Sequence, residues 1–287
     1  MPHLPHLRRR DRRWRGRHPS MRWQMQRYAI RFRGHSDRFQ APHSNFWADT
    51  TDGVRLAGTK LGDGDIAVVL VHGFMSYRTK PKWLFLAEAL SERFTVYTFD
   101  LRGHGQSGGA CTGGEREALD VAAVVAHARS RGAQRIVTVG GSLGGIAVVR
   151  EASEDPTLAG VVAISTPATW TGSDSKHVKR AQFLFTSRVG RALAKRLMGT
   201  RIHLDWGEPA TPAALVGKIA PTPLLIIHGA DDHFFPSTEA EELFARAGEP
   251  KRLVIEPTFG HAEDGFTPAF AARLRDEISA LVGARAV

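Results

Sequence analysis

The stretch that decides the fold is residues 136–145, which read IVTVGGSLGG. The apolar and β-branched residues 136–139 predict a buried strand, and the residues that follow the glycines predict a helix. Between them lies the pattern Gly-x-Ser-x-Gly, made by Gly140, Ser142 and Gly144. Glycines permit a strained, tight turn that lifts the serine hydroxyl into the open, and the helix amino terminus offers N–H donors. The segment predicts a nucleophile elbow; the simpler interpretation is a glycine-rich turn with an incidental serine.

Strand and helix patterns alternate on both sides of this segment. Ala67–Val71 is a continuous apolar run, which is typical of a strand that is buried on both faces. The other expected strands are 46–51 and 54–61, joined by an Asp52-Gly53 hairpin turn, and 94–99, 135–139, 158–164, 223–227 and 252–255. Helices are expected near 81–92, 115–131, 143–153, 237–247 and 266–282. The alternation predicts an α/β fold with a mostly parallel central sheet flanked by helices.

A serine nucleophile needs a general base, and the base needs an acid that orients it. The chain has 13 histidines, so only their position can select one. His261 follows the strand at 252–255, and the loop 228–236 follows the strand at 223–227. Both loops lie at the carboxyl ends of predicted strands, as the elbow does, and open α/β sheets place their sites at that edge.

The loop 228–236 offers several candidates. Asp231 and Asp232 are adjacent, and either could be the orienting acid. His228 and His233 compete with His261 for the role of base, but structural roles in the loop suit both of them better. We therefore predict that His261 is the base.

One interval breaks the alternation of strands and helices. Residues 169–220 separate two predicted core strands by far more than an ordinary connection, so we predict a short inserted helical cap. Between residues 171 and 201 it carries eight Lys or Arg and one acid. Apolar side chains recur every fourth residue and predict one lid helix with a basic opposite face; they are Phe185, Val189, Leu193 and Leu197. That basic face either keeps the lid soluble or approaches anionic lipid or acidic substrates.

The net charge of +10 belongs to the start of the chain. Residues 1–40 hold 12 Arg, no Lys and two acids, whereas residues 41–287 hold 27 basic and 27 acidic side chains. A neutral body argues against nucleic acid as a partner. We expect a basic, disordered tail at 1–40 and one domain at 41–287. Because no apolar segment follows the charges, a secretory leader is not indicated; an organellar transit peptide and translation from Met21 or Met25 stay open.

The sequence also argues against disulfides, membrane spans, metals and nucleotides. Cys111 is the only cysteine, and no apolar run approaches the roughly 18–20 residues that span a bilayer. Residues 103–108 match Gly-x-Gly-x-x-Gly after a strand, but more glycines prolong that loop where a dinucleotide site needs a helix. No compact cluster of His, Asp and Glu occurs outside His3 and His6. We predict no cofactor and no metal.

Five motifs in chain order resemble the α/β-hydrolase superfamily over residues 46–283. They are His72-Gly73-Phe74, the segment 100–107 (DLRGHGQS), the elbow 140–144, the loop 229–236 and Gly260-His261. Residues 96–107 and the Gly-Gly-Glu that follows are similar to the lysophospholipase-like and serine-aminopeptidase-like branch, which includes monoacylglycerol lipases. The resemblance implies an α/β-hydrolase fold with a helical cap insertion and a Ser–His–Asp triad.

The resemblance also assigns roles to single residues. Ser142 would be the nucleophile and His261 the base, and the family's G-x-x-D loop, counted from Gly229, makes Asp232 the acid. The backbone N–H groups of Phe74 and Leu143 would form the oxyanion hole.

Four further residues are predicted to line the acyl pocket. They are Met75, Phe183, Phe185 and Leu193, although core packing explains apolar side chains at such positions almost as well.

These residues predict a serine hydrolase that cleaves carboxylic esters with medium to long acyl groups or other apolar substrates. Thioester, amide, lactone, carbon–carbon and cofactor-free peroxidase chemistry would use the same triad and stay open. The alternative from another class is an inactive module that binds membranes or anions through its basic tail and cap. We expect a cytoplasmic protein that acts on a small-molecule ester, with weak peripheral association with anionic membranes through tail and cap.

Overall fold

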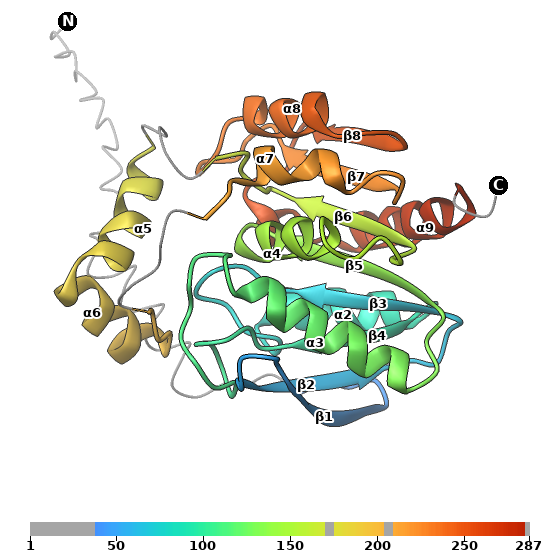
Figure 1. Ribbon diagram of the computed structural model, residues 1–287, viewed down its shortest axis with the longest axis horizontal. Coiled ribbons are helices and arrows are strands. Elements are labelled where there is room, and N and C mark those ends of the chain that lie inside the picture. Colours follow the sequence, from blue (N-terminus) through green and yellow to red (C-terminus); the bar gives the residue numbers. More distant parts are fainter. Residues whose placement is uncertain (1–37, 170–174, 204–208, 285–287) are drawn as a thin grey trace, which may run out of the picture.

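The structure, a computed structural model, describes residues 38–169, 175–203 and 209–284. An eight-stranded sheet runs through this part of the chain, in the order β1-β2-β4-β3-β5-β6-β7-β8 (Figure 1). Its strands are β1 His43–Asp49, β2 Arg55–Leu61, β3 Ile66–Val71, β4 Thr95–Phe99, β5 Arg135–Gly141, β6 Gly160–Ile164, β7 Leu224–Gly229 and β8 Lys251–Glu256. All eight coincide with predicted strands to within a few residues.

The sheet is mostly parallel, as predicted. β1 pairs with β2 and β2 with β4 in antiparallel register, whereas the neighbours from β4 to β8 are all parallel. Parallel strands end at one common edge of the sheet. The loops that follow β3, β4, β5, β7 and β8 therefore gather there, and they carry every predicted catalytic residue.

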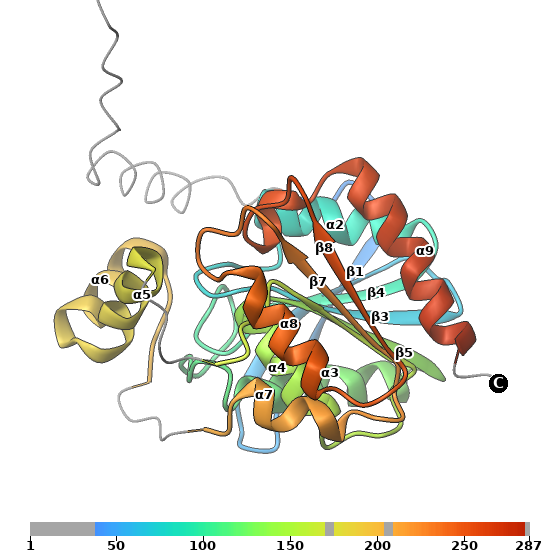
Figure 2. The ribbon, with the colours of Figure 1, turned by 90° about the horizontal axis from the view of Figure 1, so that it is seen from above.

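Helices cover both faces of the sheet (Figure 2). One face carries α2 (Pro81–Ser91) and α9 (Pro268–Ala284); the other carries α3 (Glu117–Ser130), α4 (Leu143–Ala152) and α8 (Ser237–Arg246). Side chains alternate along β3, so Val68 and Leu70 belong to the core under α2 and α9, whereas Val69 and Val71 belong to the core under α3 and α4. Burial on both faces explains why the strands are continuous apolar runs.

The packed body begins ahead of the predicted boundary at residue 41. Phe39 is buried in the core under α2, and the N–H groups of Gln40 and Ala41 both donate to the carboxylate of Glu88. Residues 1–37, which make up almost all of the predicted basic tail, lie outside the described residues.

The cap contains two helices where the sequence predicts one continuous lid helix. They are α5 (Lys176–Thr186) and α6 (Arg188–Met198), followed by the short α7 (Pro212–Leu215). The chain is extended at Ser187, whose hydroxyl accepts a hydrogen bond from Gly190 N and so caps the start of α6. The prediction of one helix is therefore wrong, and the four-residue apolar stripe is divided between two axes. Residues 170–174 and 204–208 of the predicted insertion lie outside the described residues.

Both ends of the described cap segment, 175–203, are attached to the body. At its start, the hydroxyl of Ser175 donates to the carbonyl of His233 at 3.0 Å. At its end, Ile202 forms a parallel bridge with Cys111, and Arg201 N donates to Gly103 O at 2.8 Å. The cap is thus tied to the loop after β7 and to the loop after β4. No helix in the described part of the chain is long and apolar enough to cross a membrane.

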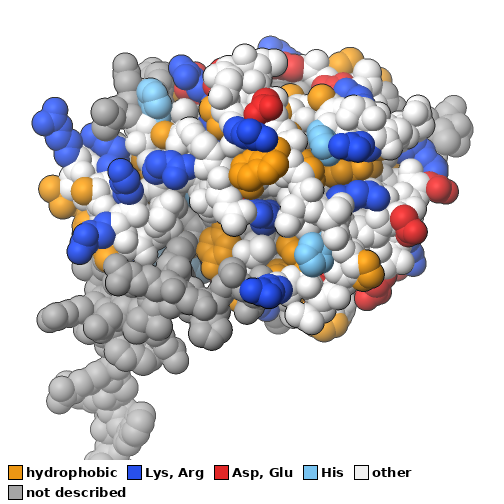
Figure 3. All heavy atoms as spheres, turned by 90° about the horizontal axis from the view of Figure 1, so that it is seen from below, with side chains coloured by type: hydrophobic (Ala, Val, Ile, Leu, Met, Phe, Trp, Pro, Cys, Tyr) orange, Lys and Arg blue, Asp and Glu red, His pale blue; other side chains and the backbone are white. Residues whose placement is uncertain are grey.

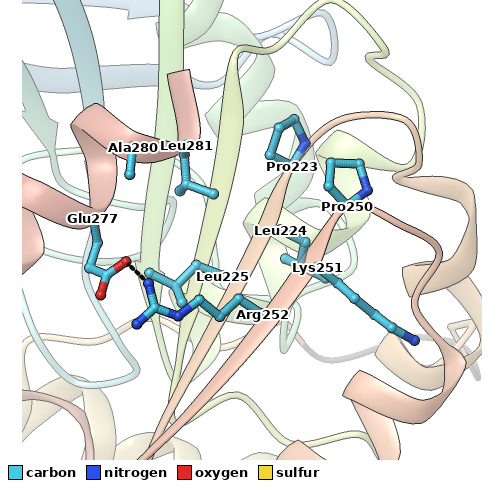
Figure 4. A pocket seen from close by; sticks show the side chains of 9 residues that line it. All are labelled: Pro223, Leu224, Leu225, Pro250, Lys251, Arg252, Glu277, Ala280 and Leu281. Carbon is cyan, nitrogen blue, oxygen red and sulfur yellow. Dashed lines mark hydrogen bonds and ion pairs between the residues drawn. The ribbon is translucent and has the colours of Figure 1, made fainter. Parts of the chain in front are cut away.

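Two surface hollows of about 190 Å³ each lie away from the carboxyl edge of the sheet. The first lies where β7 and β8 begin, between Pro223, Pro250 and Leu281, with the ion pair of Arg252 and Glu277 along one side (Figure 4). The second is a groove between α3 and α4. No predicted catalytic residue lines either one.

The groove between α3 and α4 contains a buried acid, Glu151. Its side chain is 4% exposed, and its Oε2 has no hydrogen-bond partner among the described residues. Burial raises the pKa of Glu151 to about 8, and the neighbouring carboxylates of Asp155 and Glu154 raise it further than Arg129 lowers it. The folded protein therefore holds this proton up to a pH at which the unfolded chain has lost it.

We expect Glu151→Gln to stabilise the protein at alkaline pH. A pKa that is raised in the folded state lowers the free energy of unfolding as the pH climbs from the ordinary value of about 4.5 toward about 8. The variant should match the wild type near pH 4 and exceed it by a few kcal/mol near pH 8, at about 1.4 kcal/mol per pKa unit. Urea unfolding across this range measures the difference. Glu154→Gln is the exposed control, and equal gains from both variants would contradict the assignment.

Candidate active site

Ser142 lies at a sharp turn between β5 and α4. Its backbone has φ 54° and ψ −117°, a strained conformation for a residue with a side chain. The backbone packs closely at this turn: a Cβ on Gly140 would lie 2.2 Å from Gly144 O, and one on Gly144 would lie 2.4 Å from Val71 O. Both glycines of the motif are thus required by close backbone approach. The turn has the geometry of the predicted elbow, with Ser142 partly exposed at the carboxyl edge of the sheet.

His261 and Asp232 meet at the same edge. His261 Nδ1 lies 2.8 Å from Asp232 Oδ2, and the other oxygen, Oδ1, accepts from Phe234 N at 2.8 Å and from Phe235 N at 3.1 Å. The Asp232 side chain is fully buried, and that of His261 is 13% exposed. Three donors therefore fix the carboxylate, and the carboxylate fixes the orientation of the imidazole. The hydrogen bonds among the described residues join His261 to Asp232 but not to Ser142.

Hydrogen bonding keeps Asp232 charged. Burial alone would raise its pKa, but the hydrogen bond and charge of His261, together with the Phe235 and Phe234 N–H groups, outweigh burial and lower the pKa below its usual value. An ionised carboxylate at Nδ1 leaves Nε2 of the imidazole to face the opposite way. That arrangement suits an imidazole that takes up and returns a proton.

The competing candidates make other hydrogen bonds, although His228 Nε2 also lies 3.7 Å from Asp232 Oδ2. Asp231 is exposed, and its backbone N–H donates to Phe259 O at 3.2 Å. His228 is completely buried and contacts Phe235 O through Nε2 at 3.0 Å. His233 is exposed and meets His177 of α5 in an edge-to-face contact, with 4.8 Å between ring centroids. The structure therefore brings Asp232, and not Asp231, into contact with His261.

The loop after β8 lies directly against the elbow. A Cβ on Gly141 would lie 3.4 Å from the Cβ of Ala262, the residue after His261. On the other side, a Cβ on Gly73 would lie 3.4 Å from the Cβ of Ser142. The serine is therefore enclosed between the loop that carries His261 and the loop that carries Phe74.

Two buried histidines hold the Phe74 loop in place. His72 Nε2 accepts from Leu101 N at 3.0 Å, and His104 Nε2 accepts from Met75 N at 3.2 Å. Each ring then carries its proton on Nδ1, which contacts a backbone carbonyl, Gly73 O for His72 and Arg102 O for His104. Burial lowers the pKa of both His72 and His104 to about 3, so both imidazoles stay neutral. Their hydrogen bonds to the backbone hold the Phe74 loop in position.

The two predicted oxyanion donors border Ser142. Leu143 is the first residue of α4, so its N–H has no acceptor one helical turn earlier and points out of the helix amino terminus. Phe74 lies in the loop beside Ser142, and its ring packs on Phe185 of the cap with 4.5 Å between centroids. The cap thus contacts the residue whose backbone N–H would bind an oxyanion.

The predicted pocket residues occupy different environments. Phe185 is buried at 5% exposure and contacts Phe74, and Met75 is half-buried in the Phe74 loop. Leu193, on α6, is also half-buried. Phe183 is 48% exposed on the outside of the cap. The structure thus brings Phe185 and Met75 to the Phe74 loop and leaves much of Phe183 facing solvent.

Sequence reasoning missed residues that connect the loops of the site. Glu263, two positions after His261, accepts hydrogen bonds from Ser76, Lys80 and Trp83 on the opposite loop and α2. Ser165 accepts from Ala262 N at 2.9 Å. No motif marks Glu263, because its partners are about 180 positions away in the chain.

The parallel sheet and the residues at its carboxyl edge can be compared with known families of proteins. The family model of the alpha/beta hydrolase family matches residues 68–278, and the chain belongs to that family.

Three individual proteins are similar to this chain. YfhR of Escherichia coli O157:H7, an uncharacterized protein, is 29% identical over 225 residues, which cover 74% of this chain and 71% of that protein. The pimeloyl-(acyl-carrier protein) methyl ester esterase of Nitrosomonas europaea is 29% identical over 231 residues, which cover 68% of this chain and 88% of that protein. The esterase Pf2001 of Pyrococcus furiosus has a TM-score of 0.69 at 22% identity, over 85% of this chain and 92% of that one, a likeness that shows the fold.

Proposed function

We propose that this chain is a serine esterase that hydrolyses carboxylic esters through an acyl-enzyme, with Ser142, His261 and Asp232 as its triad. The observation that carries the proposal is the 2.8 Å contact between His261 Nδ1 and Asp232 Oδ2 at the edge where Ser142 occupies a strained elbow. The name of the Nitrosomonas europaea relative, a methyl ester esterase, supports the choice of an ester as substrate.

The reaction follows from the placement of these groups. Ser142 Oγ attacks the ester carbonyl while His261 Nε2 takes its proton, and the carbonyl oxygen becomes an anion. The alcohol leaves with that proton and the acyl group stays on Ser142. Water then attacks the acyl group, His261 takes its proton, and the acid leaves as Ser142 regains a proton. Asp232 keeps Nδ1 protonated and stabilises the imidazolium in both steps.

The oxyanion would be bound by two backbone donors. Phe74, in the loop beside Ser142, and Leu143, the next residue in the chain, would each offer a backbone N–H, and a donor of this kind contributes about 3 kcal/mol to the stability of the transition state in other enzymes. His72 and His104 fix the loop that carries Phe74, so this donor needs no rearrangement during the reaction.

The test of the proposal is the dependence of kcat/KM on acyl length, from p-nitrophenyl acetate to the laurate. If the cap covers the acyl site through Phe185, each buried methylene adds up to about 0.8 kcal/mol until the site is full. The rate should therefore rise from acetate to medium or long chains. No hydrolysis of any member of the series would contradict the proposed esterase.

Phe185→Ala should flatten this profile, because it removes the ring that packs on Phe74. Phe183→Ala removes the same group two positions away, where the ring is half exposed, and should change the profile little. Leu193→Ala tests whether α6 contributes to the dependence of kcat/KM on acyl length. A peak at acetate that ignores both Phe185→Ala and Leu193→Ala would show that the cap does not shape the acyl site.

A further inference from the structure

The two cap helices carry only one sign of charge. Residues 175–203 hold eight Lys or Arg and no Asp or Glu. Six of these cations are exposed: Lys176, Lys179, Arg180, Arg188, Lys195 and Arg196. In the space-filling view of Figure 3, Lys and Arg side chains gather at the left end of the molecule, where the cap lies. This cationic surface is separate from the buried side of the cap that holds Phe185.

Large apolar side chains are exposed in the midst of these cations. Four large hydrophobic residues are exposed in the described part of the chain, and two of them, Phe183 at 48% and Val189 at 65%, lie on the cap. They flank the bend at Ser187. The first turn of α6 packs on the last turn of α5, since a Cβ on Gly190 would lie 2.3 Å from Phe183 O. The bend therefore brings the backbone at Phe183 close to Gly190, the residue after Val189, and Arg188 directly precedes Val189 in the chain.

The rest of residues 41–287 carries the opposite charge to the cap helices. Residues 41–287 hold 27 basic and 27 acidic side chains, so the excess of eight cations on the cap is matched by an equal excess of acids elsewhere. Within residues 41–287, basic helices on an otherwise acidic body favour contact through those helices with a negatively charged surface.

We propose that the bend between α5 and α6 is a docking surface for an anionic lipid bilayer, in which Phe183 and Val189 enter the interface and the surrounding cations contact lipid headgroups. Apolar side chains projecting between Lys and Arg are the combination that binds such interfaces, with the apolar groups in the acyl boundary and the charges at the headgroups. Each Lys or Arg near an anionic membrane contributes about 1 kcal/mol at physiological salt. An acidic protein would be held by the same charges but gives no reason for the exposed phenylalanine.

The first measurement is the partition of the full chain onto vesicles of equal parts phosphatidylglycerol and phosphatidylcholine, by co-sedimentation. The double substitution Arg180→Glu and Arg188→Glu should weaken binding at least about thirtyfold, the effect of removing two interactions of about 1 kcal/mol each. The matched control is Arg131→Glu with Lys218→Glu, two exposed cations near the starts of β5 and β7. Equal weakening by the two pairs, or none by the cap pair, would overturn the proposal.

The second measurement separates a bilayer from a soluble polyanion. Phe183→Ala with Val189→Ala should lower vesicle partition about fivefold to tenfold, because half-exposed apolar side chains lose their burial in the interface. The same variant should bind polyglutamate as the wild type does. If vesicle binding is unchanged by these two substitutions, the surface is a general polyanion site and the membrane proposal fails.

The third measurement reports on the bend itself, whatever residues 1–37 contribute to binding. Cys111 is the only cysteine and is buried, so Val189→Cys supplies a single reactive thiol for an environment-sensitive fluorophore. Anionic vesicles should shift its emission to the blue, whereas the same fluorophore on Arg131→Cys should not respond. Equal responses, or none at position 189, would show that the bend does not enter the membrane.

Discussion

Replacing Ser142 by alanine should leave a folded protein that hydrolyses p-nitrophenyl esters at least about 10⁴-fold more slowly than the wild type. The oxygen that attacks the carbonyl is then missing, and the oxyanion donors at Phe74 and Leu143 can only assist water. The fold should persist, because the elbow is held by the close approach of Gly140 and Gly144 and not by the serine hydroxyl. The measurement is kcat/KM on a short-chain ester, with thermal unfolding as the test of folding.

A serine-directed fluorophosphonate probe gives a second readout. It should label the wild type and Ser130→Ala, in which an exposed serine at the end of α3 is changed, but not Ser142→Ala. Retention of most of the activity by Ser142→Ala would make another residue the nucleophile.

Asp232→Asn should lower kcat by about 10⁴, as the loss of the orienting carboxylate does in other triads. The amide cannot hold the proton of His261 on Nδ1 in the same way and cannot stabilise an imidazolium. The two backbone bonds from Phe234 and Phe235 can still be accepted by the amide oxygen, so the loop should keep its conformation.

Asp231→Asn is the matched control, one residue away and with the same change of charge. Because Asp231 is exposed and does not contact His261, its substitution should cost little activity. Equal damage from the two variants, or greater damage from Asp231→Asn, would reverse the assignment of the acid.

The parallel sheet could be predicted because local sequence decides it. Strands buried on both faces must be apolar throughout, so an apolar run such as 67–71 can be recognised as a strand from the sequence. The elbow could be predicted equally well, because the backbone approaches so closely at positions 140 and 144 that only glycine fits there. The candidates Ser142 and His261 follow from their places at strand ends. The choice between Asp231 and Asp232 needed the resemblance, because adjacent residues in a loop differ only in which way they face.

The cap and the supports of the site could not be predicted in the same detail. A four-residue apolar repeat continues through Ser187, but a serine that caps the next helix can end one helix and begin another without changing the repeat. Glu263 and His104 act on partners far along the chain, and long-range contacts leave no local pattern. The contact of Phe185 with Phe74 depends in the same way on how the cap folds back on the body.

The bridge between Ile202 and Cys111 has a consequence for protein engineering. Residues 201–203 form hydrogen bonds with the loop at 103–111, so the end of the cap is part of the body's own backbone network. A chimera that exchanges only residues 176–198 for the lid of a relative keeps these hydrogen bonds. A chimera whose exchanged segment extends beyond residue 203 must also take the matching loop after β4 from that relative. Transplanted lids should therefore be joined ahead of Thr200, with Phe74 and the new counterpart of Phe185 varied together as one unit.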